Sequence, residues 1–321
     1  MKLLITGANG LLGQKLVTLL SAAANVEVIA TGKGDNRNQS KVTNYQFYTM
    51  DITSPQEIER IIGYCMPDAV IHAAGMTNVA ECETAQADCW QLNVEAVKHL
   101  LAVTGRHNIF FQYISSDFVF DGKSGPYAEE AEPAPINFYG KSKMAAEQLV
   151  QASSTPWAIV RAPMVYGVAP VMSRSNLVLW VKESLEQQQP IFVVNDQWRT
   201  PVIAEDLAMG CFLIAKNKHR GVFNISGKAY YTPYEMALAT AKAFGLDPAM
   251  ITETDCSRFE ETVKRPAKTG LQVRKAEQVL GFRPRTLEEG LAIVARQLRH
   301  YERKQNQEAL VQATTPVKVT A

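Results

Sequence analysis

The chain lacks any long apolar segment. No run of about 18 apolar residues occurs in its 321 residues, although a membrane-spanning helix needs about that many. The apolar start Met1–Ile5 is interrupted by Thr6 and Gly7, which leaves it too short for the hydrophobic region of a signal peptide. A buried first strand explains this start better, and we expect no membrane association.

Cysteine and histidine are scarce and irregularly spaced. The chain has five cysteines, an odd number, no two of them at Cys-x-x-Cys spacing, and five scattered histidines. We therefore predict neither a disulfide framework nor a metal site, and a reducing cytoplasm is the expected location. Cys82 or Cys89 stays open as a nucleophile, although a small buried thiol is the more common role.

The chain also lacks an excess of charge of either sign. Its formal net charge is +1, and no basic stripe with interleaved aromatic residues occurs. We therefore expect neither nucleic acid nor an anionic membrane as a partner. A hydrophobic content of 46% and a charged content of 20% are typical of a globular protein with an ample core. The length favours two structural lobes or one large domain.

Near the N-terminus, an apolar strand leads directly into a glycine-rich turn and then into a helix. Lys2–Thr6 has the pattern of a strand, Gly7, Gly10 and Gly13 follow, and leucines recur at helical spacing over Leu12–Leu20. Such glycines let the backbone approach a pyrophosphate at the positive end of a helix. Because the strand and the helix supply the context that this motif needs, we predict a nucleotide site. A plain tight turn is the alternative.

The end of the second predicted strand, Val26–Ala30, bears on the choice of cofactor. Sites that prefer NAD usually have an acidic residue there, which binds the adenosine ribose. This chain has no acid at that strand end, but Lys33 and Arg37 lie close by. We therefore expect NADP(H), whereas NAD(H) remains possible because Asp35 can also reach the ribose. A solvated polar loop is the other interpretation.

Two further strands are predicted to end beside the same cleft. Asp51 follows the strand Gln46–Met50 and is placed either to meet the adenine or to cap the next helix. The strand Ala69–His72 is followed by three small residues that let a cofactor pass closely, namely Ala73, Ala74 and Gly75. His72 itself is expected to be a packed strand-end histidine rather than a catalyst.

The fifth predicted strand, Ile109–Ile114, leads into Ser115, Ser116 and Asp117. Reactive groups of open α/β sheets gather at the carboxyl ends of strands, so Ser116 and Asp117 are well placed. In the helix predicted before this strand, Asn93 is a poor helix former and suggests a packing or water-binding role.

The order of elements predicts an α/β fold with a Rossmann-type doubly wound parallel sheet and a smaller mixed lobe. Strands and helices alternate up to the sixth strand, Ala158–Arg161, and the pattern then changes. We expect a dinucleotide-binding domain over 1–161 and a substrate lobe over 162–302, part of which can return to the sheet. We expect a disordered tail over 303–321.

Tyr139 and Lys143 form the candidate catalytic pair. They are four residues apart, so on a helix both side chains lie on one face. The pKa of an unperturbed tyrosine, about 10, is high for proton exchange at neutral pH, and a nearby lysine cation lowers it. With Ser116 holding a substrate carbonyl, Tyr139 can protonate the alkoxide that forms as a hydride arrives. An ordinary surface pair is the alternative, but of the eleven tyrosines Tyr139 alone has Lys at the fourth following position.

These motifs together resemble those of the extended short-chain dehydrogenase/reductase family. The finer similarity is to dTDP-4-dehydrorhamnose reductases and their relatives, and it runs from Met1 to about Arg299. It rests on the glycine motif Gly7-x-x-Gly10-x-x-Gly13, Ile114–Gly122, Pro126-Tyr127, Glu129, Pro135–Lys143, Glu147, Arg161-Ala162-Pro163 and Tyr166-Gly167. The stretches Ile114–Gly122 and Pro135–Lys143 are long and specific to the family, whereas the glycine motif alone is not.

The resemblance implies a role for each matching position. Tyr139 is implied to be the proton donor, Lys143 to hold the nicotinamide ribose and Ser116 to orient the keto group, with Asp117 adjacent. The implied cofactor contacts are Gly10, Leu11 and Leu12 at the pyrophosphate, Asp51 and Ile52 at the adenine, and Ala73, Ala74 and Gly75 under the phosphates. Thr77 is implied to face a nucleotide-sugar substrate, and a homodimer is possible.

The chain departs from the family pattern near the expected substrate lobe. The family often has Asp-Gln, then Gly, then Pro-Thr, where this chain has Asp196–Val202 with Trp198 and Arg199 inside. These two side chains can stack on a base and pair with a phosphate, or they can mark a relative with another substrate. The departure bears on the substrate and not on the reductase chemistry; the resemblance as a whole implies a reductase of a nucleotide-linked 4-keto sugar.

Two other functions remain open. One is a sugar-nucleotide epimerase or dehydratase, although Phe118 stands where related dehydratases have a second carboxylate. The other is a regulatory subunit similar to the β subunit of methionine adenosyltransferase, which the intact Ser116, Tyr139 and Lys143 argue against.

Overall fold

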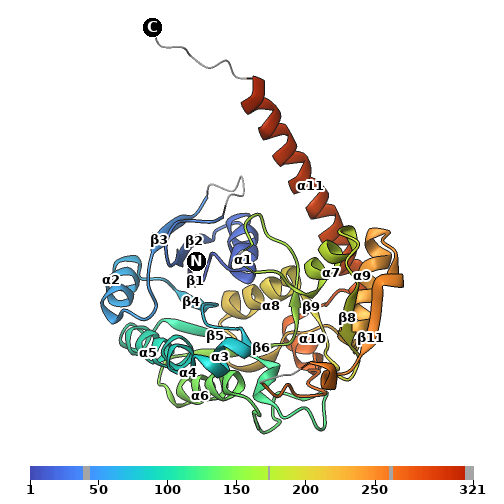
Figure 1. Cartoon of the computed structure of the whole chain (residues 1–321). Coiled ribbons are helices and arrows are strands. Elements are labelled where there is room, and N and C mark those ends of the chain that lie inside the picture. The colour runs from blue at the N-terminus through green and yellow to red at the C-terminus, as the bar shows by residue number, and fades with distance from the viewer. Residues whose placement is uncertain (39–43, 173, 260–262, 315–321) are drawn as a thin grey trace.

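A seven-stranded parallel sheet forms the centre of the molecule (Figure 1). The computed structural model describes residues 1–38, 44–172, 174–259 and 263–314, with the side chains of the last helix described as far as residue 303. The strand order is β10-β6-β5-β4-β1-β2-β3, and all its registered neighbours are parallel. The strands are β1 Lys2–Thr6, β2 Glu27–Gly32, β3 Gln46–Thr49, β4 Ala69–His72, β5 Phe110–Ser116, β6 Trp157–Ala162 and β10 Gly221–Asn224.

Helices cover both faces of this sheet, which confirms the predicted doubly wound fold. Along β1, Leu3 and Ile5 face one apolar core and Leu4 faces the other, because successive strand residues point to opposite sides. The first core is closed by α1 (Leu11–Ser21) and α8 (Ala204–Asn217), and the second by α2 (Pro55–Cys65), α5 (Ala96–Arg106) and α6 (Phe138–Ala152). Burial from both sides explains why the strands are apolar almost without interruption.

The second half of the chain builds a smaller mixed lobe and also contributes to the main sheet. β10 pairs with β6, and α8 packs on α1. The remaining elements are β7 Val165–Tyr166, α7 Leu177–Glu186, β8 Ile191–Val194, β9 Val202–Ile203, α9 Pro233–Phe244, β11 Ile251–Thr254, α10 Arg274–Leu280 and α11 Leu287–Thr314. β8 pairs with β11, and these strands pack with α7 and α9 around a core of their own.

The last helix corrects the prediction for the C-terminal tail. α11 continues to Thr314 and extends away from the rest of the molecule (Figure 1), so the helix includes residues 303–314, for which we expected disorder. Its N-terminal half is anchored because Leu291 and Val294 are buried. Glu, Lys, Gln, Ala and Leu, which dominate the continuation, are strong helix formers and prolong a helix once it has been nucleated. Residues 315–321 of the predicted tail lie outside the described residues.

Candidate functional site

The candidate site lies at the carboxyl ends of β1, β4 and β5. The strand order reverses at β1, which has β2 on one side and β4 on the other. In open α/β sheets, ligands bind in the crevice outside the carboxyl ends of the strands at such a reversal. The glycine-rich turn follows β1, the small residues follow β4, and Ser116 ends β5.

The glycine-rich turn fits a dinucleotide pyrophosphate. Gly7 has φ +70°, and a Cβ atom there would lie 2.7 Å from the backbone nitrogen of Ala74. A Cβ at Gly13 would lie 2.2 Å from the carbonyl oxygen of Gly7, so α1 can begin this close to β1 only with glycine. Gly10 is the N-cap of α1 and makes no side-chain cap. The first turn of α1, with Leu11 and Leu12, therefore presents its amide groups and positive dipole end to an anion.

The predicted adenosine contacts are only partly available. The Lys33 ammonium lies 2.9 Å from Asp51 Oδ2 and is exposed, and Arg37 is also exposed. Asp51 accepts hydrogen bonds from the backbone nitrogen and hydroxyl of Thr53, and these bonds lower the pKa of its carboxyl. Ser54, not Asp51, caps α2. Ile52 is buried in one of the two apolar cores of the sheet.

His72 is a packed residue of the strand end, as expected. Its imidazole is buried, lies 2.7 Å from the Thr6 hydroxyl and stacks between Phe111 and Tyr113. Burial, aided by the positive charge of Lys143, lowers the pKa of His72 to about 3. A neutral, enclosed imidazole at this place supports the sheet and does not exchange protons at neutral pH.

Asn93 holds the segment that follows β4. Its carboxamide accepts from the backbone nitrogen of Met76 at 2.8 Å and donates to the carbonyl of Met76 at 3.0 Å and the Ser142 hydroxyl at 3.0 Å. Asn93 lies in a π-helical turn, Gln91–Glu95, which connects α4 (Gln86–Trp90) to α5. Such π turns occur frequently at functional sites. Ala73 and Ala74 are half-buried and Gly75 is exposed beside this link.

Ser116, Tyr139 and Lys143 are brought together as predicted. All three are at most 8% exposed, and the Ser116 hydroxyl lies close enough to Tyr139 to lower the pKa of its phenol. The Lys143 ammonium donates to the carbonyl of Ile114 at 2.7 Å and lies 4.3 Å from the centre of the Tyr113 ring. Because Tyr139 and Lys143 both lie on α6, their side chains share the face that meets the end of β5.

The protonation of this group differs from the prediction. Burial raises the pKa of Tyr139, the hydrogen bond with Ser116 opposes the shift, and the carboxylate of Asp117 adds to it. Burial also lowers the pKa of Lys143 to about 8. The pKa of Tyr139 is thus raised overall in the protein by itself, where we expected it to be lowered, because removal from water has the largest effect. The phenol is therefore protonated at neutral pH.

Asp117 and Arg199 form a buried pair behind Ser116. Asp117 accepts from the Ser116 hydroxyl at 3.2 Å and from the Thr269 hydroxyl, and its Oδ2 lies 3.8 Å from Arg199 Nε. Both charged side chains are 2% exposed. Burial raises the pKa of the Asp117 carboxyl, and the Arg199 guanidinium opposes this shift most strongly.

Arg199 does not occupy the substrate-facing position that we predicted. Its guanidinium donates to the carbonyls of Trp198, Ala267 and Pro266 and to the side chain of Gln197. With these donors engaged and the side chain buried, Arg199 fastens the 264–269 segment to Asp117 instead of reaching a phosphate. Nothing in the sequence indicated that Thr269 contacts Asp117 or that Arg199 holds this segment.

The other predicted substrate contacts lie at the surface. Trp198 is 39% exposed, and Thr77 is exposed and accepts a hydrogen bond from Arg174 at 3.1 Å. The 264–269 segment is rich in exposed cations, Lys264, Arg265 and Lys268.

The 264–269 segment also meets the helix that carries Tyr139. The carbonyl of Lys264 accepts at 3.0 Å from Asn137, which caps α6 through the backbone nitrogen of Gly140 at 2.8 Å. Asn137 was not among the predicted site residues, although an asparagine two residues before Tyr139 is a typical N-cap signal.

Cys82 and Cys89 are buried beside Tyr139 in one apolar cluster. All five cysteines lie in the described part of the chain, and none of them forms a disulfide there. The Cys89 thiol contacts the hydroxyl of Ser142 at 3.5 Å. Because both side chains are fully buried, their role as small packed thiols is better supported than a nucleophilic one.

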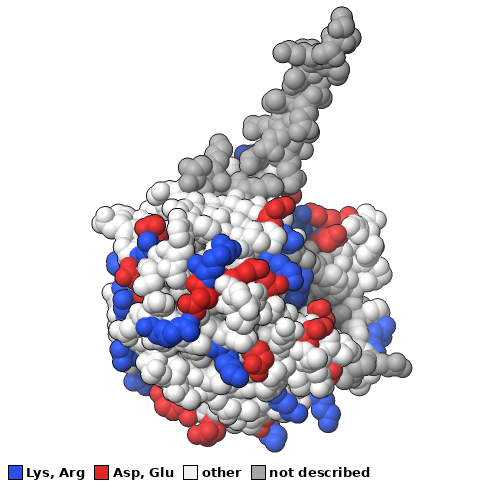
Figure 2. Space-filling view, turned by 90° about the vertical axis from the view of Figure 1, so that its left-hand side faces the viewer, with Lys and Arg blue, Asp and Glu red and all other residues white. Residues whose placement is uncertain are grey.

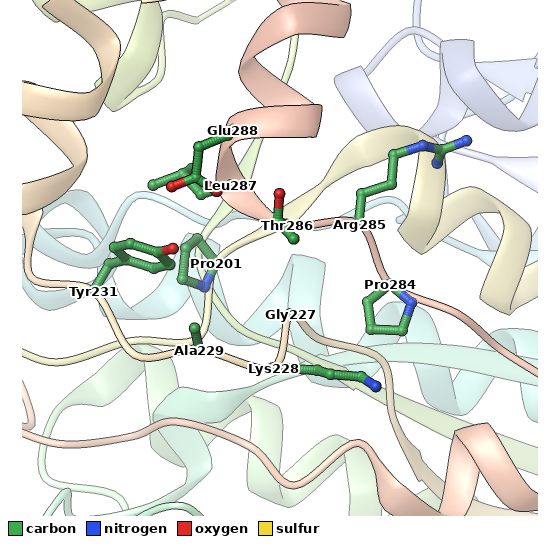
Figure 3. A pocket seen from close by; sticks show the side chains of 10 residues that line it. All are labelled: Pro201, Gly227, Lys228, Ala229, Tyr231, Pro284, Arg285, Thr286, Leu287 and Glu288. Carbon is green, nitrogen blue, oxygen red and sulfur yellow. The ribbon is translucent and has the colours of Figure 1, made fainter. Parts of the chain in front are cut away.

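A cavity away from the catalytic group lies in the second lobe (Figure 3). It has a volume of about 140 Å³, and its ten lining residues include none of the predicted catalytic residues. Tyr231 and Pro201 lie side by side there, while Lys228 and Arg285 extend away from Tyr231 (Figure 3). Sites for drug-sized ligands measure about 300–1,000 Å³, so this cavity is too small for a dinucleotide or a nucleotide sugar.

Other kinds of site find no support in the described part of the chain. No group of three or more acidic, His or Cys side chains there is arranged to hold a metal ion, and none of the described helices is long and apolar enough to cross a membrane. On the face that Figure 2 shows, cations and anions are interspersed.

Comparisons with known proteins agree with this geometry. A family model described as RmlD substrate binding domain matches residues 1–300. The chain is 30% identical over 270 residues to the dTDP-4-keto-6-deoxy-D-glucose reductase of Streptomyces niveus, covering 84% of this chain and 87% of that protein. It is also 30% identical over 290 residues to the methionine adenosyltransferase 2 subunit beta of Rattus norvegicus, covering 89% and 84%. The crystal structure of a dTDP-4-dehydrorhamnose reductase from Clostridium acetobutylicum matches with a TM-score of 0.82 and 29% identity, covering 93% of this chain and 100% of that one.

Proposed function

The chain belongs to the RmlD substrate binding domain family, and we propose that it reduces the keto group of a nucleotide-linked 4-keto sugar with a nicotinamide dinucleotide. The family match confirms the resemblance that the sequence motifs indicated. The reductases of Streptomyces niveus and Clostridium acetobutylicum, which this chain resembles over most of its length, support dTDP-4-dehydrorhamnose or a close analogue as the substrate.

The observation that carries the proposal is the buried group of Ser116, Tyr139 and Lys143 beside the dinucleotide turn. The Ser116 hydroxyl lies close enough to Tyr139 to lower the pKa of its phenol, and Lys143 lies one helical turn after Tyr139. A carbonyl oxygen placed between the two hydroxyls accepts from both. This arrangement orients a ketone and supplies a proton to its oxygen.

Tyr139 is protonated at neutral pH, because its pKa does not fall below the ordinary tyrosine value of about 10. It therefore has a proton to give when negative charge develops on the carbonyl oxygen, and its pKa must be lowered in the complex for this transfer to be fast. A bound nicotinamide supplies the hydride to the carbonyl carbon. Ser116 orients the carbonyl, and the cation of Lys143 near Tyr139 stabilises the phenolate after the proton has left. In the protein by itself Asp117, held by Arg199, accepts the Ser116 proton, so this hydroxyl must turn from Asp117 to the carbonyl when the ketone binds.

We infer NADPH as the preferred cofactor. The glycine turn and the first turn of α1 would hold the pyrophosphate, with Ala73, Ala74 and Gly75 passing under it. β2 ends at Gly32 without an acidic residue, and the exposed cations Lys33 and Arg37 follow. This charge favours a ribose 2′-phosphate over a 2′-hydroxyl.

The 264–269 segment offers a site for the diphosphate of the substrate. It meets the catalytic group through Arg199 and through the N-cap of α6, and it carries the cations Lys264, Arg265 and Lys268 on its exposed side. Trp198, which pairs with this segment and is partly exposed, is placed to stack on the base. These contacts replace the phosphate contact first expected of Arg199.

The test is NADPH consumption by the purified protein with freshly prepared dTDP-4-dehydrorhamnose, with NADH in parallel. We expect turnover with NADPH and slower turnover with NADH. An epimerase of the same fold would change the sugar without net oxidation of NADPH. No turnover on any keto sugar, with NADPH still protecting the fold against heat, would contradict the proposal and favour a regulatory role.

A further inference from the structure

The loop that follows β2 is fastened to the glycine-rich turn by one side chain, that of Asn9. The Asn9 carboxamide donates to the carbonyl of Asp35 at 2.9 Å and to that of Lys33 at 3.5 Å. Its oxygen accepts from the backbone nitrogen of Arg37 at 2.9 Å. One side chain of the pyrophosphate turn thus contacts the backbone of residues 33, 35 and 37 in the loop expected to meet the adenosine ribose.

The surroundings of Asn9 are built to hold it there. A Cβ atom at Gly32 would lie 3.0 Å from Asn9 Nδ2, so the glycine that ends β2 leaves room for the carboxamide. The carbonyl of Asn9 accepts at 3.0 Å from Gln14, a buried residue that also donates to Val171 at 2.7 Å. Asn9 therefore stands on a rigid turn and acts on a loop whose own side chains are exposed.

This arrangement bears on the two cations of the loop. Lys33 and Arg37 are both exposed, and the Lys33 ammonium is turned toward Asp51. The hydrogen bond from Arg37 to Asn9 fixes the backbone of Arg37 beside the turn that receives the pyrophosphate. The 2′-position of the adenosine ribose is read near this point in dinucleotide folds.

We propose that Asn9 is a specificity-determining positioning residue, which sets the preference for NADPH over NADH by fixing the 33–37 loop. It acts through the loop backbone, and Arg37 supplies the charge that meets the 2′-phosphate. The inference rests on the NADPH preference proposed above and is independent of the sugar. Without Asn9 the loop keeps its sequence but loses the bonds that hold Asp35 and Arg37 over the turn.

The test is direct cofactor binding by the full chain, followed by the fluorescence of NADPH and NADH. N9A removes all three of these hydrogen bonds, and it should weaken NADPH binding about tenfold and NADH binding less than about threefold. The double variant N9A/R37Q should bind NADPH about as weakly as R37Q, because residues that act through one another are not additive. T18A, which removes a side-chain bond from the exposed side of α1, is the control and should bind like the wild type.

Each outcome decides a different point. A wild-type preference that N9A retains, or additive effects of N9A and R37Q, would overturn the role of Asn9 and leave the NADPH preference intact. Equal wild-type affinity for both cofactors would overturn both. If N9A weakened the binding of NADPH and NADH equally, Asn9 would only support the turn and would not set the cofactor preference. If N9A melts early, N9D keeps the size and the contact with Arg37, but it places an oxygen against the carbonyl of Asp35. It should then weaken NADPH binding more than NADH binding.

Discussion

The first half of the chain supplies the reactive groups of the candidate site, and the second half supplies the groups that hold them. Ser116, Tyr139 and Lys143 come from one strand end and the next helix. Arg199 and Thr269 reach the same place from the smaller lobe, and Thr269 is 152 residues from the Asp117 to which it donates. A local motif can therefore reveal the chemistry, whereas the support of that chemistry depends on how distant segments fold together.

The largest effect is expected when the proton donor, which lies in the first half of the chain, is removed. Tyr139→Phe should lower kcat by about 10²–10⁴-fold, the usual size of an acid–base contribution, and leave NADPH binding within about twofold. Steady-state kinetics with the keto sugar and a fluorescence titration measure the two quantities. Tyr166→Phe, which changes a buried tyrosine away from the catalytic group, should retain turnover. Unchanged turnover in Tyr139→Phe would sink the assignment of the proton donor.

A large effect is also expected on the second side, at Arg199. Arg199→Met leaves Asp117 buried without its cation, so the free energy of unfolding should fall by about 3–5 kcal/mol. The pKa of Asp117 should rise further, because the attraction that opposes burial is gone. The Ser116 hydroxyl then loses its fixed acceptor, and kcat should fall about tenfold. Urea unfolding and kinetics of the folded fraction measure both effects.

Lys15→Met is the matched control for Arg199. Lys15 pairs with Glu205 at 2.7 Å between α1 and α8, away from Ser116. Lys15→Met should lower the free energy of unfolding but leave kcat unchanged. If Arg199→Met lowered the free energy of unfolding but left kcat unchanged, the second half would stabilise the first half without contributing to catalysis.

His72 gives a pH-dependent prediction within the first half. The pKa of His72 is about 3 in the folded protein and about 6.5 when unfolded. Between these values the unfolded chain binds a proton that the folded chain does not, so stability falls as the pH falls. From pH 7 to pH 5 this contribution is about 2 kcal/mol. Urea titrations at several pH values should show that His72→Gln reduces this loss of stability, whereas a change at the exposed His107 does not. If both variants showed the same dependence of the free energy of unfolding on pH, the buried, neutral imidazole would be contradicted.

The smallest expected effect concerns the link between the halves at the N-cap of α6. Asn137→Ala should reduce the free energy of unfolding by about 1–2 kcal/mol, in the range for a lost cap, and lower kcat about threefold because Tyr139 loses part of its support. Asn176 is the matched control, since it caps α7 and donates to Gly167 at 2.7 Å in a similar way. Asn176→Ala should cost similar stability with no change in kcat. If Asn137→Ala and Asn176→Ala had the same kcat, the Asn137 cap would only stabilise the fold.

The sequence revealed the sheet and the reactive group because both depend on short-range patterns. β1 and β4 lie at the residues predicted for them, since short apolar runs mark them directly. The motif around Ser116 and the pair on α6 are likewise local. The 303–314 helix was missed because a polar segment without an apolar stripe gives no periodic signal, even when an anchored helix continues through it.

The role of Arg199 could not be predicted, for a different reason. An arginine next to a partly exposed tryptophan has the composition of a phosphate-binding site, and no local pattern reveals that its guanidinium is buried against Asp117. The direction of the Tyr139 pKa was missed for a related reason. Spacing shows that Lys143 is near, but only the fold shows that Tyr139 is buried and that burial has the largest effect on its pKa.

The most direct test of the central claim is the fate of a deuterium label carried by NADPH at the reactive carbon of its nicotinamide. The purified protein is incubated with labelled NADPH and dTDP-4-dehydrorhamnose, and the sugar product is analysed by mass spectrometry. If the chain is a reductase that uses Ser116, Tyr139 and Lys143, the product carries one deuterium at the former keto carbon, and Tyr139→Phe gives almost none in the same time. An unlabelled product, or no product while NADPH remains bound, would contradict the account.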